Sequence, residues 1–146
     1  MDSKIRQVRP TDLPDIIKIE EQSFSDPYPE RLLKSLATFY SSTFLVAETK
    51  KKVVGYASAI MENGGSAHLL SIAVDPIYRQ QKIAKKLLGA LVQLLRDKAA
   101  LRLRLEVREN NVLALGLYEA LGFRRRRTVK SYYQDGTNAT RMELEL

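Results

Sequence analysis

The hydrophobic repeat changes twice between residues 67 and 107, and this change constrains the fold more than any other feature of the chain. Residues 67–74 form an apolar run that is typical of a strand. Apolar residues from Ile83 to Leu95 then recur at helical spacing, in a helix that we expect to end near Lys98. Residues 101–107 alternate between apolar and charged side chains, which predicts a strand with its leucines on one face. Strand, helix and strand in this order predict a crossover that joins two parallel strands.

The segments before this unit predict two helices and an antiparallel meander. Thr11 and Asp12 are expected to cap a helix whose apolar residues begin at Leu13. The prolines at 27 and 29 end that helix, and a second helix is expected at about residues 30–38. Asn63-Gly64-Gly65 is a hairpin signal. The expected strands of this half cover residues 5–8, 44–49 and 53–61.

The segments after the unit add one helix and a hairpin. Asn110-Asn111 can cap a helix that runs to Leu121, and Gly122 is placed to end it. Residues 128–133 and 141–146 are expected to be strands joined by a turn at Asp135-Gly136. The fold class is therefore mixed α/β, with a mostly antiparallel sheet, one parallel pair and about four helices. No linker, repeat or low-complexity tract interrupts residues 1–146, so we expect a single domain.

The composition excludes several kinds of functional site. The chain has no cysteine, which rules out disulfides, cysteine-bound metal and a thiol nucleophile supplied by the protein. His68 is the single histidine, which rules out a zinc site made of several imidazoles, and we expect no metal. No apolar stretch reaches the roughly 18 residues of a membrane span, and the start of the chain lacks the apolar core of a secretion signal. A cytoplasmic protein without a membrane partner is expected.

The positive charge favours anionic partners. Lysine and arginine number 24 and aspartate and glutamate 17, so the formal net charge is +7. Such an excess is typical of proteins that bind nucleic acid, a phosphorylated cofactor or an anionic surface, and also of many that bind nothing acidic. The densest run, Arg124 to Arg127, fits a solvated strand start or loop. Because no helix-turn-helix, zinc finger or aromatic RNA-binding motif is present, we expect no specific binding of nucleic acid.

The junction between the expected strand at 67–74 and the helix after it is polar and basic. Free N–H groups of a first helical turn attract anions, and here Arg79, Lys82 and Lys85 flank them. A pyrophosphate would suit this turn. The same residues also fit a plain strand–helix connection with solvated lysines, because the glycines of a Walker or dinucleotide-binding loop are missing.

Three side chains outside this turn are candidates for chemistry. Glu106 lies on the charged face of the strand at 101–107, where it is either a general base or an ion-pair partner of nearby arginines. Tyr118 lies near the apolar stripe of the next helix and could be a half-buried core residue whose hydroxyl has one partner. His68 begins the strand that leads to the anion turn, and it is either structural or catalytic.

Two groups of motifs make the chain similar to the GNAT superfamily of N-acetyltransferases. The core motif of that family resembles LSIAVDP at 70–76 followed by YRQQKIA at 78–84. Its second half resembles LEVRENN at 105–111 and LYEALGF at 117–123. The combination is close to the branch that acetylates protein N-termini, which includes the ribosomal-protein alanine acetyltransferase and archaeal N-terminal acetyltransferases. YYQDG at 132–136 also matches that branch, and the similarity covers nearly the whole chain.

The resemblance implies direct transfer of an acetyl group from acetyl-CoA to an amine, without a covalent enzyme intermediate. Backbone groups of residues 72–74 would bind the pantetheine, with the N–H of Val74 stabilising the oxyanion. The N–H groups of the turn would hold the pyrophosphate, and the side chain of Asn111 would contact the cofactor. The implied cofactor residues are Ile72, Ala73, Val74, Arg79, Gln80, Gln81, Lys82, Ile83, Ala84, Lys85 and Asn111. Lys82 stands where the family has a glycine, and a lysine fits there if its φ is helical.

The attacking amine must be neutral, and this favours an N-terminus over a lysine. With reference pKa values of about 8 and 10.4, roughly a tenth of α-amines but well under a thousandth of lysines are neutral at pH 7. We expect Glu106 to be the base, acting through a water, and Tyr118 to donate a proton to the CoA thiolate. His68 is similar to a histidine of archaeal relatives and is a second candidate base. Arginine neighbours are expected to lower the pKa of Glu106, which weakens it as a base.

The peptide is expected to lie between two walls. Tyr132 and Tyr133 resemble hairpin tyrosines that hold the substrate backbone, while Phe24, Pro27 and Tyr28 occupy the place of the opposite wall or serve only as loop anchors. The implied partners are protein N-termini, with ribosomal proteins and nascent chains among them, and we expect a monomer or weak homodimer. The alternatives are an acetyltransferase for lysine or a small-molecule amine, and a non-catalytic CoA-binding protein of the same fold.

Overall fold

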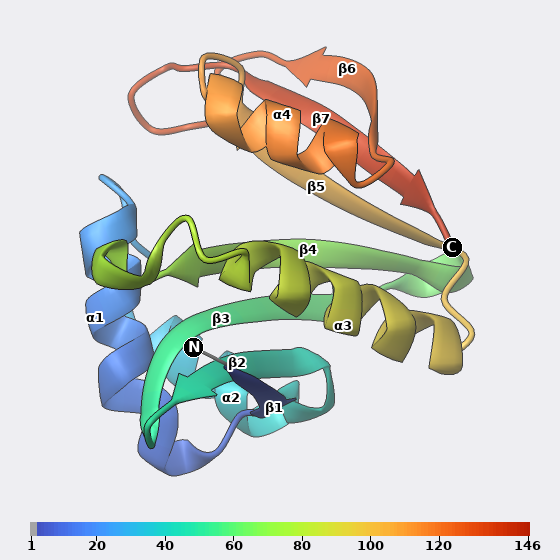
Figure 1. Cartoon of the computed structure of the whole chain (residues 1–146). Coiled ribbons are helices and arrows are strands. Elements are labelled where there is room, and N and C mark those ends of the chain that lie inside the picture. Colours follow the sequence, from blue (N-terminus) through green and yellow to red (C-terminus); the bar gives the residue numbers. More distant parts are fainter. Residues whose placement is uncertain (1–2) are drawn as a thin grey trace.

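One seven-stranded sheet organises the computed structural model, which describes residues 3–146. The strand order is β1-β2-β3-β4-β5-β7-β6, and β4 and β5 are the parallel pair (Figure 1). This confirms the mixed α/β class with a mostly antiparallel sheet and four α-helices. The strands are β1 Lys4–Gln7, β2 Phe44–Thr49, β3 Lys52–Met61, β4 Ser66–Val74, β5 Arg102–Arg108, β6 Arg124–Val129 and β7 Ala139–Glu145, and the helices are α1 Leu13–Ser23, α2 Glu30–Phe39, α3 Ile83–Asp97 and α4 Val112–Ala120.

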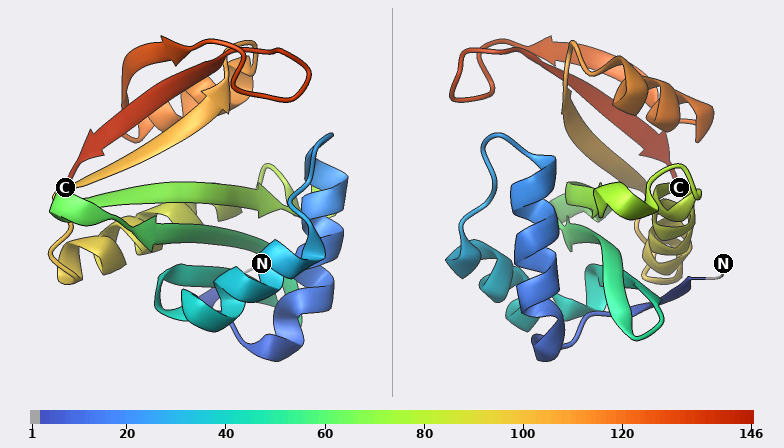
Figure 2. Two further views of the ribbon diagram at one scale, coloured as in Figure 1. Left: turned by 180° about the vertical axis from the view of Figure 1, so that it is seen from behind. Right: turned by 60° about the vertical axis from the view of Figure 1, so that its left-hand side comes forward.

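Helices cover the sheet on both faces. Helices α3 and α4 lie on one face, and α1 and α2 lie on the other (Figures 1 and 2). The predicted apolar stripe of α3 is buried in the first core, where Leu87 and Leu91 are fully inaccessible. The second core lies under α1 and α2, around Ile16 and Tyr56. Each fully buried leucine of this kind contributes about 2 kcal/mol to stability, so the helical spacing read from the sequence is also what fixes α3 on the sheet.

Strands β4 and β5 pair along only a short part of their length. The parallel register joins Ser66 to Arg102, Ala67 to Leu103 and His68 to Arg104, and ends there. Beyond this point β5 pairs with β7 alone, and the two halves of the sheet separate as a wedge (Figure 1). Within residues 3–146, no strand pairs with this edge of β4 after His68, so backbone N–H and C=O groups there are available to a ligand.

A β-bulge in β4 lies at the start of this wedge. Ala59 of β3 pairs with Leu69 and Ser58 pairs with Ser71, which leaves Leu70 as the extra residue. Residues three apart face opposite sides of a regular strand. The extra residue cancels that alternation, so that His68 and Ser71 both line the cleft described below.

The C-terminal hairpin differs from the prediction. The prediction of a strand at residues 128–133 is wrong, because β6 covers Arg124–Val129. Tyr132 and Tyr133 lie in the loop that follows β6. The arginine run therefore lies in a strand, at the exposed edge of the sheet, where charged side chains protect against pairing with another chain. Gly122 has a φ of 100° and ends α4 as predicted.

The first helix begins after a short 3₁₀ turn. Asp12 is the N-cap of α1, as predicted, but its carboxylate accepts the N–H of Arg9 at 2.7 Å rather than an N–H of α1. It also pairs with Arg6 of β1 at 2.8 Å, which ties the start of the helix to the sheet. None of the helices in residues 3–146 is both long and apolar enough to cross a membrane.

Candidate active site

A cleft of about 600 Å³ opens where β4 and β5 separate. Its walls come from these two strands, from α4, from the loop between α1 and α2, and from the loop between β6 and β7. The three expected catalytic residues and the five expected peptide-binding residues all line it: Glu106, Tyr118, His68, Phe24, Pro27, Tyr28, Tyr132 and Tyr133. Ile72 and Asn111 line it as well, whereas the other expected cofactor residues lie outside it, at the end of β4, in the turn before α3 and in the first turn of α3.

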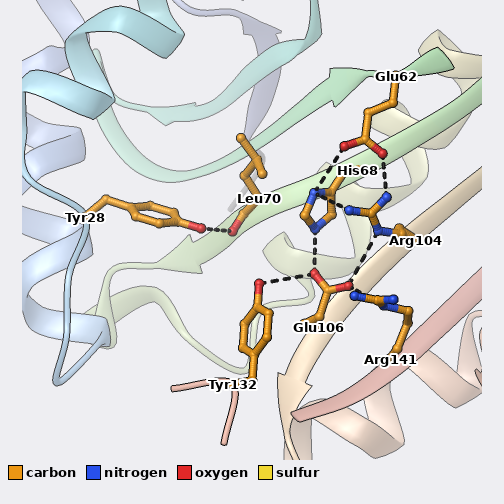
Figure 3. Close-up of polar contacts among 8 residues, drawn as sticks. All are labelled: Tyr28, Glu62, His68, Leu70, Arg104, Glu106, Tyr132 and Arg141. Atoms are coloured by element: carbon orange, nitrogen blue, oxygen red, sulfur yellow. Dashed lines mark hydrogen bonds and ion pairs between the residues drawn. The ribbon is translucent and has the colours of Figure 1, made fainter. Parts of the chain in front are cut away.

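Glu106 is a nearly enclosed acidic group in the cleft, surrounded by donors. Only 3% of its side chain is exposed, and it accepts hydrogen bonds from His68 Nε2 at 2.6 Å and Arg141 Nε at 2.8 Å (Figure 3). Tyr132 Oη donates to the same carboxylate at 3.4 Å, and Arg104 Nε lies 3.5 Å away. Burial alone would raise the pKa of Glu106, but its hydrogen bonds with His68 and Arg141 and the charge of Arg141 outweigh it and lower the pKa to about 2. Glu106 is therefore ionised at neutral pH and is a weak proton acceptor.

The arginine that lowers the pKa of Glu106 lies on a different strand than expected. We expected the arginines of its own strand to lower its pKa, and Arg104 does lie near. The closer arginine is Arg141, which faces Glu106 directly in the β5–β7 register. The sequence could not show this pairing, because it depends on the register of two strands that are far apart in the chain.

The hydrogen bonds of His68 assign its tautomer. Arg104 Nη2 lies 3.2 Å from His68 Nδ1, and a guanidinium can only donate, so Nδ1 accepts. The ring proton is then on Nε2, which donates to Glu106 Oε1. Glu62 holds Arg104 in place, because Glu62 Oε1 lies 2.5 Å from Arg104 Nη1 (Figure 3). The two candidate bases thus form one hydrogen-bonded pair rather than two independent sites.

Tyr118 reaches the cleft from the other side of β5. It is buried in the first core, where its ring packs edge-on against Phe123 with centroids 5.6 Å apart. Burial raises the pKa of its hydroxyl to about 12. Its side chain forms no hydrogen bond within residues 3–146. A protonated phenol that lines the cleft and has no protein acceptor is suited to donate a proton to a ligand.

Two hydrogen bonds of Tyr28 hold the loop between α1 and α2, one to α1 and one to β4. The N–H of Tyr28 donates to Glu20 Oε2 at 2.9 Å, and its hydroxyl donates to the carbonyl of Leu70 at 3.1 Å (Figure 3). The second contact meets the extra residue of the β4 bulge. Burial, together with the nearby Tyr132, raises the pKa of Tyr28 to about 12. Burial raises the pKa of Tyr132 as well, so the hydroxyls of Tyr28 and Tyr132 both remain protonated donors at neutral pH.

Glu20 is a lining residue that the sequence analysis missed. Its side chain is 2% exposed, and Oε1 accepts hydrogen bonds from Ser71 Oγ at 3.1 Å and from the hydroxyl of Tyr56. A signal was present, because Glu20 follows Ile16 by four residues and so lies on the buried stripe of α1. A carboxylate at such a position needs donors around it, and here it has three.

The turn between β4 and α3 has two residues in the left-handed region. Gln80 has a φ of 67° and Lys82 a φ of 62°, so the condition of a helical φ, under which we expected a lysine to fit here, is not met. Lys82 is the N-cap of α3, and the first helical hydrogen bond runs from the N–H of Lys86 to its carbonyl. The N–H groups of residues 83–85 have no helical acceptor, which fits an anionic phosphate group.

Arg79 and Asn111 have structural contacts in addition to their expected cofactor role. Arg79 donates from Nε to the carbonyl of Val74 at 3.0 Å and from Nη2 to Ser23 Oγ at 3.2 Å, which holds the turn against α1. Asn111 Oδ1 accepts the N–H of Ala114 at 3.1 Å and caps α4, as predicted for this helix. Asn111 also lines the cleft.

Comparison with known proteins points to one family. The model of the acetyltransferase (GNAT) family matches residues 13–123. The N-alpha-acetyltransferase of Sulfurisphaera tokodaii is 34% identical over 98% of this chain and 93% of its own. The [ribosomal protein bS18]-alanine N-acetyltransferase of Escherichia coli is 32% identical over 88% of this chain and 86% of its own. Among solved structures, Ard1 from Thermoplasma volcanium superposes with a TM-score of 0.96 at 28% identity, covering 100% of this chain and 99% of its own.

Proposed function

Because this chain belongs to the acetyltransferase (GNAT) family, we propose that it transfers the acetyl group of acetyl-CoA to the N-terminal α-amine of proteins or peptides. The observation that carries the proposal is the convergence of Glu106, Tyr118 and a tyrosine-lined entrance on one cleft at the β4–β5 wedge. The names of the Sulfurisphaera tokodaii and Escherichia coli relatives support an N-terminal substrate. We extend the proposal to residues 1–146 as one acetyltransferase domain, with ribosomal proteins among the candidate substrates.

The unpaired edge of β4 and the turn before α3 fit acetyl-CoA. Backbone groups of residues 72–74 face the wedge and would bind the pantetheine as a neighbouring strand would. The N–H groups of residues 83–85 would hold the pyrophosphate, with Lys82 and Lys85 adding positive charge. The amide nitrogen of Asn111 would donate to the cofactor from the opposite side. When bound, acetyl-CoA supplies an activated thioester, and the chain itself needs no nucleophile.

Glu106 and the cleft tyrosines handle the substrate amine and its proton. About a tenth of α-amines are already neutral at pH 7, so a strong base is not required to prepare them. The ionised Glu106 accepts a hydrogen bond from the amine, directly or through a water, and takes up the proton that the nitrogen loses once it has attacked. His68 and Arg141 keep the carboxylate fixed and charged. Tyr118 is protonated and donates to the departing sulfur.

A peptide assay tests this function. The purified chain is incubated with acetyl-CoA and peptides that differ at the first two residues, each carrying an internal lysine, and products are mapped by fragmentation mass spectrometry. We expect acetylation of the α-amine and an untouched lysine, and the same peptides with a blocked N-terminus are expected to remain unmodified. Acetylation confined to the lysine would contradict the proposal and identify a lysine acetyltransferase instead.

The Glu106→Gln variant tests the catalytic assignment within the same assay. Gln keeps the size of the side chain but cannot accept a proton, so we expect kcat to fall by about a hundredfold. The KM for acetyl-CoA should stay within about twofold, because Glu106 lies outside the turn that holds the pyrophosphate. A variant with unchanged kcat at saturating peptide would remove Glu106 from the mechanism.

A further inference from the structure

Arg108, the last residue of β5, contacts both loops that form the peptide-facing walls of the cleft. Its Nη1 lies 2.9 Å from Asp135 Oδ2 and 3.1 Å from Asp135 Oδ1, in the loop between β6 and β7. Its Nη2 lies 3.4 Å from Asp26 Oδ2, in the loop between α1 and α2. The guanidinium also stacks on Tyr133, with Cζ 4.1 Å from the ring centroid. One side chain therefore joins two segments that are more than a hundred residues apart in sequence.

The geometry of these contacts requires an arginine. A guanidinium is planar and offers donors along two edges and a face for stacking, so it can meet two carboxylates and a ring at once. A lysine has a single charged point and can satisfy only one of these partners at a time. The three contacts together define the position of both loops relative to β5.

The contacts are better suited to positioning than to stabilising the fold. The side chains of Asp26 and Asp135 are 37% and 58% exposed, and ion pairs in such surroundings contribute little to stability. Without the arginine, however, two carboxylates would face each other across the mouth of the cleft with no cation between them. Their repulsion would drive the loops apart.

We propose that Arg108 is a positioning residue that sets the width of the cleft mouth, and thereby the affinity for the first residues of the peptide. The inference rests on the proposed function, because it concerns the entrance of the peptide that is to be acetylated. Arg108 acts through the loops that carry Tyr28 and Tyr133, and it takes no part in the chemical step.

The test compares Arg108→Lys and Arg108→Gln with the wild type in steady-state kinetics on an uncharged peptide. We expect the peptide KM to rise roughly five- to tenfold, the scale of two exposed ion pairs and one cation–π contact, while kcat and the KM for acetyl-CoA stay within about twofold. Arg125→Gln is the matched control, because Arg125 pairs with Glu119 at 3.1 Å between β6 and α4 and lies away from the cleft lining.

Two further measurements separate positioning from a loss of fold. Adding Asp26→Asn to Arg108→Gln removes one of the two repelling charges, and the peptide KM should recover in part. Raising the salt concentration should raise the peptide KM of the wild type, because its exposed ion pairs are screened, and should lower that of Arg108→Gln, because the repulsion between the two aspartates is screened. Unchanged peptide KM in both Arg108 variants, or an equal rise in the KM for acetyl-CoA, would overturn the inference. A wild-type chain that acetylates no α-amine would instead overturn the proposed function, and this inference with it.

Discussion

His68 Nε2 donates to Glu106 Oε1 across 2.6 Å, from the last residue of β4 that pairs with β5 to a residue two positions further along β5 than its partner Arg104. The contact joins the two sides of the wedge just where the strands separate. It also limits what the histidine can do: Nε2 faces Glu106 and Nδ1 faces Arg104, so neither ring nitrogen is free to meet the substrate. His68 is thus a partner of the Glu106 carboxylate, and the substrate proton goes to the carboxylate or a water.

The ionised Glu106 makes stability sensitive to acid. Its pKa is about 2 in the folded chain, below its ordinary value of 4.5, so its contribution is fully present above about pH 4.5 and is lost as the pH falls toward 2. The shift corresponds to a contribution on the order of 3 kcal/mol at neutral pH. In urea unfolding, Glu106→Gln should be less stable than the wild type at pH 7, and the gap should close by pH 2. A gap that is constant across this range would contradict the assignment, and Glu119→Gln, which breaks an exposed pair, should cost less than about 1 kcal/mol throughout.

Loss of the Tyr118 hydroxyl should slow turnover without weakening binding. We expect Tyr118→Phe to lower kcat by about ten- to a hundredfold, because a proton donor to the leaving sulfur is removed while the ring and its contact with Phe123 remain. The KM values for peptide and acetyl-CoA should change little. Initial rates of thiol release measure this. Tyr40→Phe, at an exposed position outside the cleft lining, is the control, and equal kcat for the two variants would argue against a catalytic Tyr118.

Lys82 combines an unfavourable backbone conformation with a useful charge, and two substitutions separate these effects. Lys82→Gly removes both, and it should raise the free energy of unfolding by up to about 1 kcal/mol, because glycine adopts a φ of 62° without strain. Lys82→Ala keeps the strained Cβ and should leave stability nearly unchanged. Both should weaken CoA binding by roughly two- to fivefold through the lost ammonium, as measured by calorimetric titration. Tighter CoA binding by Lys82→Gly would show instead that the lysine side chain hinders the cofactor.

The buried carboxylate of Glu20 should be costly to remove. Glu20→Ala leaves the donors of Tyr28, Ser71 and Tyr56 without their acceptor, and we expect a loss of about 3 kcal/mol or more in the free energy of unfolding. Glu20→Gln keeps one acceptor oxygen and should lose less. Glu21→Ala, one position along the exposed face of the same helix, should stay within about 0.5 kcal/mol. Similar losses at positions 20 and 21 would contradict the anchoring role of Glu20.

The sequence predicted best those helices and strands that bury one face, because their apolar residues recur at a regular spacing. The stripe from Ile83 to Leu95 and the alternation at residues 101–107 predicted α3, β5 and their parallel partner, because each pattern reports a single buried face. The strand β6 was placed too late, since an edge strand of arginines buries neither face and shows no alternation. Tyr132 and Tyr133 have a strand-like composition, yet they lie in a loop, where they line the cleft.

Contacts between distant segments were beyond the reach of the sequence. The pair of His68 and Glu106 depends on the register of β4 and β5, and that of Arg141 and Glu106 depends on β7. The φ of Lys82 depends on how the turn connects β4 to α3, which a basic sequence does not specify. The motif resemblance supplied the candidate residues, whereas the shared hydrogen bonds that decide their protonation came from the fold.

The extra residue at Leu70 makes the length of β4 part of the chemistry. Counting from His68, which meets Glu106, Ser71 meets Glu20 only because one residue is left over between them. Deleting Leu70 would restore a regular ladder with β3, and Ser71 would then follow His68 by two residues and keep facing Glu20. The deletion would remove the Leu70 carbonyl that accepts the Tyr28 hydroxyl, so the loop between α1 and α2 would lose its tie to β4. A one-codon deletion here would therefore make the sheet more regular and release one wall of the peptide entrance.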